Sequence, residues 1–349
     1  MKKTLIALAV AGAAVATGVN AGELYNQDGT TLALGGRAEA RMSIMDGDVS
    51  DKTRVRINIS GKQEINDNLY GVGFYEAEYI TNDVDSSGTI TNDSANNQIN
   101  NRYAYAGIGG NFGEVTYGKN DAALGVITDF TDIMDYHGGN ASNKFATADR
   151  VDNLLSYAGT FGDFAVKADY RFADRIKTTS PAGYDNNEID GYSLSGIYTV
   201  ADTGLAFGLG FANQGTKTSS TTGTVGGDQW MATASYTIND LYLAALYTAK
   251  DYDNTSNDYD AFELAASYTM DKTVFYVTYG DGSRDDSVPS TTTTSSDGDF
   301  YQEVAVEAAY FFKPNFRGFV SYNFDLRDDN ETSVGKAEDE AALGLRYDF

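Results

Sequence analysis

Three aspartates stand close together in one long connection of this chain, which we place at residues 119–149. Asp129, Asp132 and Asp135 occur at intervals of three, and the single histidine, His137, follows them. Such residues can perform acid–base or metal chemistry when a nucleophile or further ligands accompany them. The sequence has no Gly-x-Ser-x-Gly elbow and no metal-binding pair of histidines or cysteines. We therefore expect no enzyme, no metal and no cofactor, and we expect His137 to be a solvated loop residue.

Apolar side chains between the aspartates distinguish this connection from the other loops. Val126, Ile127, Phe130 and Ile133 are all large enough to anchor it to a neighbouring element. A connection of this length without regular structure is usually functional or disordered, and a disordered segment lacks such apolar residues. A functional loop and a surface loop packed on its own side chains remain as alternatives. The elements around the connection must decide between them.

The first residues of the chain have the pattern of a secretory signal peptide. Residues 1–21 combine Lys2 and Lys3 with an apolar run and an ending of small residues. We therefore expect the mature chain to begin at Gly22. The formal net charge is −25 and there is no cysteine. This charge excludes binding to nucleic acid phosphates, and the exported chain must be stable without disulfides.

Alternating polar and apolar residues predict β-strands along most of the chain. Residues 37–44 place Arg37, Glu39 and Arg41 on one face and alanines, methionine and isoleucine on the other, and residues 54–64 repeat the pattern. In a soluble sandwich the apolar face points inward, whereas in a membrane barrel it faces lipid. The alternation alone is compatible with both architectures.

The spacing of the connections favours the barrel. Seven short turns alternate strictly with eight long polar connections, which implies sixteen strands. The short turns are at residues 66–68, 110–113, 161–163, 201–204, 239–240, 271–272 and 314–315. The long connections are at residues 45–51, 83–100, 119–149, 174–190, 215–228, 251–258, 281–299 and 328–339. We therefore predict an all-β fold, a 16-stranded antiparallel transmembrane barrel with short periplasmic turns and long outer loops.

Several segments carry a likeness to a known family: LALGGRAEAR, DKTRVRINISGKQEINDNLYGVGFYEAEY, RYAYAGIGGNFGEVTYGKND, ALGVITDFTDIMDYHG, KPNFRGFVSYNF and ALGLRYDF. They resemble the general, non-specific porins of Gram-negative bacteria and are most similar to the OmpU type of vibrio-like bacteria. The resemblance covers nearly all of residues 22–349. It implies a homotrimer of sixteen-stranded barrels in the outer membrane, in which the third outer loop, here residues 119–149, folds into the lumen and narrows it.

The resemblance also implies which residues line the constriction. The first acidic residue falls on Asp132, and the opposing basic wall falls on Arg37, Arg56, Arg102 and Arg150. Two further arginines on strand faces, Arg41 and Arg54, are equally well explained as partners of neighbouring carboxylates.

One part of the constriction loop departs from the family. Enteric members read Pro-Glu-Phe-Gly-Gly where this chain has Asp135-Tyr136-His137-Gly138-Gly139. We expect Asp135 to replace the missing glutamate from one residue away, with Asp129 as a nearby addition. The terminal Phe349 matches the aromatic residue that the barrel-assembly machinery of the family reads.

The implied function is that of a general diffusion porin, which allows passive passage of ions and small hydrophilic solutes across the outer membrane. Carboxylates and guanidiniums on opposite sides of a narrow aqueous gap create a transverse field that admits small polar solutes and holds back bulky apolar ones. Acidic outer loops concentrate cations within a Debye length of about 8 Å, so we expect mild cation selectivity. Lipopolysaccharide and outer-membrane lipid are expected partners.

A surface adhesin or phage receptor is the alternative function. The long connections at residues 83–100, 215–228 and 281–299 are rich in Ser, Thr, Asn and Gly, a composition typical of exposed loops. Single-channel conductance distinguishes the two functions, because a pure adhesin conducts no ions.

Overall fold

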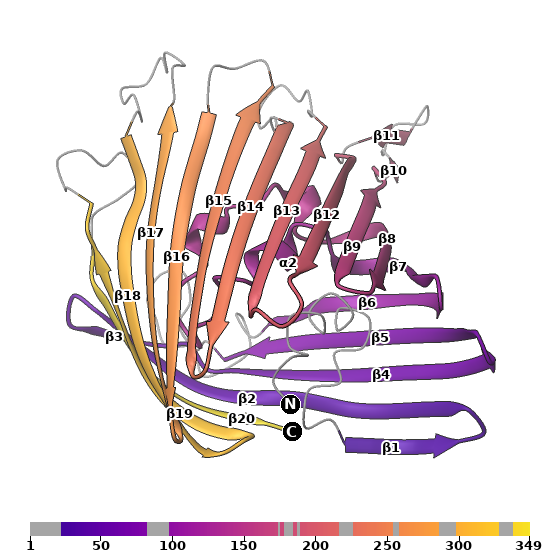
Figure 1. The fold of residues 1–349 in the computed structure, drawn as a ribbon, viewed down its shortest axis with the longest axis horizontal. Coiled ribbons are helices and arrows are strands. Elements are labelled where there is room, and N and C mark those ends of the chain that lie inside the picture. Colours follow the sequence, from indigo (N-terminus) through magenta and orange to yellow (C-terminus); the bar gives the residue numbers. More distant parts are fainter. Residues whose placement is uncertain are drawn as a thin grey trace.

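A closed ring of antiparallel strands forms almost the whole molecule (Figure 1). The computed structural model describes residues 22–81, 98–173, 175–177, 184–186, 189–215, 226–253, 258–285, 298–327 and 338–349. The predicted signal peptide, residues 1–21, lies outside the described residues. So do most residues of the six long connections predicted at 83–100, 174–190, 215–228, 251–258, 281–299 and 328–339.

Sixteen strands make up the ring, in chain order. They are β2 (Thr30–Met45), β4 (Arg54–Asn66), β5 (Leu69–Ile80), β6 (Gln98–Gly110), β7 (Gly113–Asp121), β8 (Arg150–Phe161), β9 (Phe164–Arg171), β12 (Gly191–Thr199), β13 (Leu205–Gln214), β14 (Gly227–Ile238), β15 (Leu241–Tyr252), β16 (Asp258–Met270), β17 (Thr273–Asp285), β18 (Gly298–Lys313), β19 (Phe316–Asp325) and β20 (Glu340–Asp348). Each strand pairs with the next, and β20 pairs with β2, so the predicted sixteen-stranded barrel is confirmed. All seven predicted short turns join consecutive strands of the ring.

Among the described residues, four short strands lie outside this ring, and the alternation of residue types does not predict them. β1 (Gly22–Gln27) pairs with the first part of β2, and β3 (Asp48–Asp51) forms a hairpin with its last part. β10 (Arg175–Lys177) and β11 (Tyr184–Asn186) pair only with each other. β1 begins beside β2 where β20 ends, so the two strands follow one another along the same edge.

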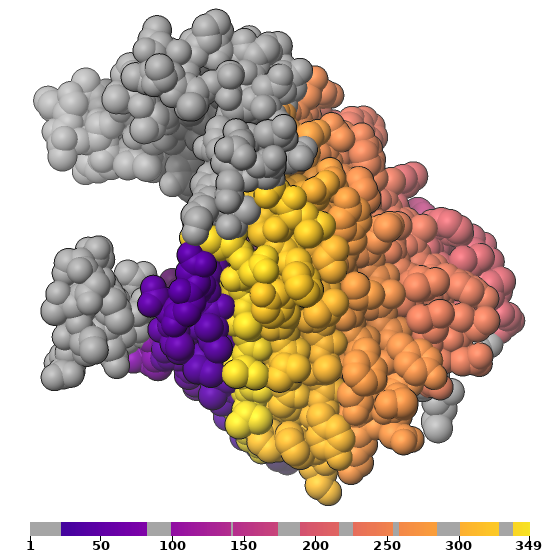
Figure 2. Space-filling view, turned by 90° about the vertical axis from the view of Figure 1, so that its left-hand side faces the viewer, coloured from indigo at the N-terminus to yellow at the C-terminus, as the bar shows by residue number. Residues whose placement is uncertain are grey.

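The seam between the last and the first strand depends on one glycine. Phe349 and Gly36 exchange two backbone hydrogen bonds, of 3.0 and 2.8 Å. A Cβ atom added to Gly36 would lie 2.3 Å from the carbonyl oxygen of Arg56 and 2.8 Å from the ring of Phe349. Only glycine therefore allows the Phe349 ring to lie across the seam. Figure 2 shows the indigo first strands directly beside the yellow last strands on the molecular surface.

The two faces of the wall have opposite character. Along β12, Tyr192 and Leu194 are exposed, whereas Ser193 and Ser195, which alternate with them, are buried. The same arrangement of exposed apolar and buried polar residues occurs in other strands, with Leu209, Trp230 and Val320 among the most exposed large side chains. This inverts the pattern of a soluble sandwich and matches a wall whose outer face contacts lipid. Among the described residues, no helix is long and apolar enough to cross a membrane.

Candidate functional site

The connection between β7 and β8 is a long segment that hydrogen-bonds and packs against buried side chains of the barrel strands. It contains the short helix α2 (Gly125–Thr128) and the 3-10 turns η1 (Asn140–Ser142) and η2 (Ala146–Ala148). Its backbone N–H groups donate hydrogen bonds to side chains of distant strands. The donors and acceptors are Ala123 to Ser193 (3.1 Å), Gly139 to Glu263 (3.1 Å), Phe145 to Gln229 (2.9 Å) and Thr147 to Gln214 (3.3 Å). The connection is therefore bonded to side chains of β12, β13, β14 and β16.

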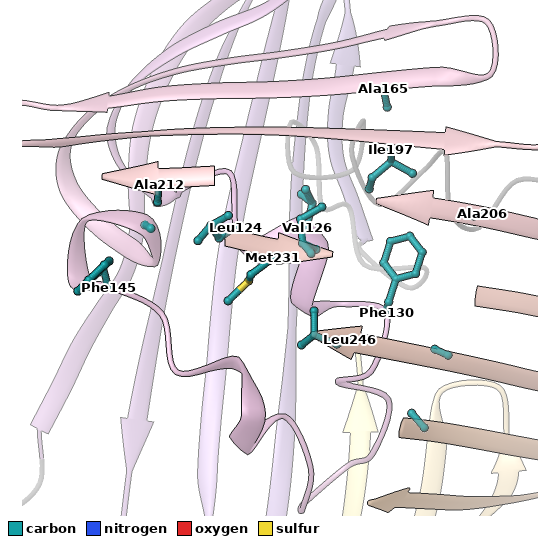
Figure 3. Packing of buried hydrophobic residues seen from close by; sticks show 14 residues of the cluster. Leu124, Val126, Phe130, Phe145, Ala165, Ile197, Ala206, Ala212, Met231 and Leu246 are labelled. Carbon is teal, nitrogen blue, oxygen red and sulfur yellow. The ribbon is translucent and has the colours of Figure 1, made fainter. Parts of the chain in front are cut away.

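Apolar side chains hold the first part of this connection against the wall. Leu124 and Ile127 are fully buried, and Val126 and Phe130 are nearly so. All four belong to one buried cluster with Ile197, Ala212, Met231 and Leu246 of the strands, and Figure 3 shows Leu124, Val126 and Phe130 among these side chains. A glycine in the wall leaves room for these side chains, because a Cβ atom on Gly210 would lie only 2.6 Å from Leu124. The expectation that apolar anchors pin the connection is confirmed, and Ile133 also packs on this cluster.

Residues 134–137 form what we call the tip of the connection, and glutamates of β18 and β20 bind it. The N–H groups of Asp135 and Tyr136 donate to the two carboxylate oxygens of Glu307, at 2.8 and 3.2 Å. The Tyr136 hydroxyl donates to Glu340 at 2.8 Å. Tyr136 therefore contacts carboxylates of two strands of the wall, through its N–H and through its hydroxyl.

His137 is buried, which makes our expectation of a solvated loop residue wrong. Its Nδ1 lies 2.7 Å from Ser321 Oγ, and its Nε2 lies 3.3 Å from Glu340. Burial lowers the pKa of His137 below its ordinary value, although the Glu340 carboxylate opposes this shift. The imidazole is therefore neutral at pH 7, and its two nitrogens link the connection to Ser321 and Glu340 of the barrel wall.

Asp135 faces a pair of arginines that the sequence analysis did not select. Its carboxylate accepts two hydrogen bonds from Arg317, at 2.7 and 2.6 Å, and one from Arg346 at 3.1 Å. Only 6% of its side chain is exposed. Asp135 is therefore engaged with the wall at β19 and β20 and does not contact Arg37, Arg56, Arg102 or Arg150.

Asp129 and Asp132 are exposed carboxylates of the connection, as is Asp149, which forms an ion pair with Lys144 at 3.2 Å. Within the described part of the chain, neither Asp129 nor Asp132 has an ion-pair or hydrogen-bond partner for its side chain. Surrounding protein raises the pKa of Asp129 to about 7, assisted by the nearby charges of Asp121 and Asp132. Burial also raises the pKa of Asp132, but Lys144, Arg37 and Arg54 oppose the increase. Asp132 thus lies in the field of the basic wall while its carboxylate remains in contact with water.

The basic wall is built from rows of charges that face each other across neighbouring strands. Arg346, Glu39 and Arg54 are direct partners on β20, β2 and β4. Glu39, which is almost fully buried, forms an ion pair with Arg54, lies 3.2 Å from Arg37 and lies 3.8 Å from Arg346. One carboxylate therefore separates three guanidiniums.

A second carboxylate repeats this arrangement one strand further on. Glu78 of β5 forms an ion pair with Arg56, which is its direct cross-strand partner. It also lies 3.6 Å from Arg54 and 3.7 Å from Arg102, and Arg102 reaches Glu76 at 2.8 Å. The predicted residues Arg56 and Arg102 are therefore in one cluster with Arg54, joined through carboxylates.

Arg150 and Arg41 contact aromatic rings. Arg150 lies 5.4 Å from the ring centroid of Tyr103, whose hydroxyl donates to Asp121 at 2.6 Å. Arg41 lies 5.3 Å from the ring of Tyr136 and donates to the carbonyl oxygen of Lys52 at 3.0 Å. The guanidinium of Arg41 therefore reaches the tip of the connection.

Several residues of this site were missed by sequence reasoning: Glu39, Glu78, Glu307, Arg317, Glu340 and Arg346. Within β20, Arg346 alternates with the exposed residues Leu345 and Tyr347, so its side chain lies on the opposite face of the strand. The contacts among these six residues depend on the register of the strand pairs, which the alternation of residue types does not define.

A sequence model described as Gram-negative porin matches residues 4–333. Outer membrane protein U of Vibrio parahaemolyticus is 52% identical over the full length of both chains, and Outer membrane protein U of Vibrio cholerae serotype O1 is 49% identical, also over the full length of both. The solved structure of Salmonella typhi OmpF in complex with daunomycin has a TM-score of 0.76 at 21% identity, covering 94% of this chain and 100% of that chain. The trimer form of Vibrio cholerae OmpT has a TM-score of 0.69 at 21% identity, covering 92% and 100%.

Proposed function

Because the chain belongs to the Gram-negative porin family, we propose that it is a general diffusion porin, with a pore narrowed by residues 119–149. The chain is a porin of the outer membrane, and its relatives are channels rather than enzymes. Passive passage of ions and small hydrophilic solutes is the activity that a water-filled barrel with a polar inner face supports.

The course of the β7–β8 connection is the observation that carries this proposal. The connection leaves β7, donates hydrogen bonds to side chains of β12, β14, β16, β18 and β20 and returns to β8, and this course supports a loop that folds into the lumen. Asp129 and Asp132 stay exposed on it, and the charge of Arg37 and Arg54 reaches Asp132. This arrangement supports a constriction with carboxylates on one side and guanidiniums on the other.

The balance of paired and unpaired charges supports a mild preference for cations. Arg37, Arg56 and Arg102 each have a carboxylate partner, which offsets part of their positive field. Asp129 and Asp132 have no such partner among the described residues. The chain as a whole has a net charge of −25, which favours cations near the pore.

Reversal potentials across planar bilayers in a salt gradient test the proposed selectivity. We expect a value on the cation side, and a value on the anion side contradicts the proposal. Swelling of liposomes in uncharged sugars of increasing size tests the constriction. The rate should fall steeply with sugar size, whereas a flat size dependence up to large oligosaccharides contradicts a narrowed pore.

A homotrimer is the proposed assembly, because a similar structure, that of OmpT, is described in a trimer form. We also propose that Phe349 acts as the assembly signal, since its ring lies across the seam at Gly36. Replacing Phe349 by serine should reduce the yield of assembled barrel in the outer membrane, as measured by fractionation. An unchanged yield contradicts this role.

A further inference from the structure

Two arginines face each other directly on neighbouring strands at the tip of the β7–β8 connection. Arg317 of β19 and Arg346 of β20 are cross-strand partners. Like charges placed directly opposite one another destabilise a sheet unless a counter-charge lies between them. Both side chains are mostly buried, with 13% and 19% exposed, so water screens this repulsion only in part.

Two carboxylates divide the donors of this arginine pair between them. Asp348, on β20 itself, is 3.2 Å from Nη1 of Arg317 and 2.8 Å from Nη2 of Arg346. Asp135, from the connection, takes the remaining donors: Nε and Nη2 of Arg317, at 2.7 and 2.6 Å, and Nη1 of Arg346 at 3.1 Å. One carboxylate belongs to the wall and the other to the loop. The pair is therefore a two-arginine carboxylate site, and a residue of the same chain occupies it.

We propose that Asp135 is a positioning residue, whose carboxylate occupies this two-arginine site and holds the tip of the connection against β19 and β20. Docking of the tip does not depend on the proposed function, and only the effect of docking on the pore rests on that function. Charge-assisted, two-point contacts between arginine and carboxylate are among the strongest polar contacts in proteins. Removing one partner of such a buried group leaves uncompensated charge, which strongly opposes the docked state.

The neighbouring contacts of the tip depend on the same docking. The N–H groups of Asp135 and Tyr136 reach Glu307 only while the tip lies on the wall. Without the contact between the arginine pair and Asp135, the hydrogen bonds to Glu307 lose their geometric support.

Thr278 of β17 offers a reporter of tip docking that does not require ion conduction. It is 2% exposed, and its Oγ1 lies 3.6 Å from the sulfur of Met134 in the tip. The chain has no cysteine, so Thr278→Cys introduces a single thiol beneath the tip. A charged methanethiosulfonate reagent should modify this thiol slowly in the docked state and faster when the tip lifts.

The experiment compares Thr278→Cys alone with Thr278→Cys combined with either Asp135→Ala or Asp129→Ala. Asp129→Ala is the matched control, because it removes the same carboxylate from an exposed position of the same connection. We expect Asp135→Ala to raise the rate of modification by at least about tenfold, and Asp129→Ala to leave it within about twofold. Sodium acetate should restore slow modification of the Asp135→Ala protein by filling the vacated carboxylate site, whereas sodium chloride at equal ionic strength should not.

Equal rates for the two double variants overturn the proposal, and so does a high rate that acetate leaves unchanged. Circular dichroism checks that each variant retains its sheet, and Asp135→Asn replaces Asp135→Ala if the latter fails to fold. Failure of the proposed function is a separate result, because it appears as an absence of conductance in the unmodified protein.

Discussion

Replacing Ile127 by alanine should loosen the β7–β8 connection without unfolding the barrel. Ile127 is fully buried between α2 and the wall, and its Cδ1 lies within 3.0 Å of the position of a Cβ atom on Gly208. The substitution removes three carbon atoms, which costs about 2.4 kcal/mol in transfer free energy, and the cavity brings the loss to about 3–4 kcal/mol. At about 1.4 kcal/mol per factor of ten, the opening equilibrium should rise by roughly two to three powers of ten.

Hydrogen exchange followed by mass spectrometry measures this opening at the level of segments. The amides of Ile127, Thr128 and Asp129 donate to carbonyl groups within the helical turn, so their exchange reports whether this turn is intact. We expect exchange of residues 124–132 to accelerate by about 100-fold or more, while the strands remain protected.

An exposed isoleucine of the wall provides the control. Ile57 lies on the outer face of β4 and is 48% exposed, so Ile57→Ala removes the same atoms without touching the connection. The reasoning is refuted if Ile127→Ala leaves exchange of residues 124–132 unchanged, or if Ile57→Ala accelerates it equally.

Three further predictions concern the carboxylates of Asp132 and Asp129 and the glycine at position 210. Asp132→Asn should lower the cation-to-anion permeability ratio roughly twofold in reversal-potential measurements, because it removes an exposed carboxylate facing the basic wall; an unchanged ratio removes Asp132 from the pore. Because the pKa of Asp129 is raised to about 7, its charge should appear as pH rises from about 6 to 8, so cation preference should increase over this range. Asp129→Asn should flatten this dependence, and a steep dependence that persists assigns it to another group. Gly210→Ala should displace α2 and increase conductance, since its Cβ would lie 2.6 Å from Leu124, whereas Gly73→Ala, with nothing within 4 Å, should have no effect; equal behaviour of the two variants contradicts the packing.

The barrel was predictable because its signals are local. Alternation along a strand and turn residues such as Asn239 and Asp271, which both adopt positive φ, can be recognised within a few residues of sequence. Sixteen strands followed from counting these signals. β1 was not predicted, because GELYNQ is too short and too polar to alternate clearly. Its pairing depends on where β20 ends.

The site was only partly predictable, because its contacts join strands that are far apart in the chain. Asp132 and the arginines of β2 and β4 were named from resemblance, and their role in the pore stays a prediction. Asp135 was expected among the residues facing the gap, but its partners come from β19 and β20, 182 and 211 residues later. No local pattern identifies such a pair, since it requires both the strand register and the path of the connection.

The burial of His137 was also not predictable from the sequence. A lone histidine in a polar segment is usually solvated, and that expectation was wrong here because the tip docks onto Ser321 and Glu340. Burial of a loop residue depends on what the loop meets, which composition does not reveal.

Single-channel recording from the purified wild-type protein in planar bilayers tests the central claim most directly. The proposed pore predicts discrete conductance steps in simple salt solutions, with a reversal potential on the cation side in a salt gradient. A surface adhesin or receptor that acts only through its outer loops conducts no ions, so a correctly assembled protein that inserts into the bilayer and produces no steps contradicts the account.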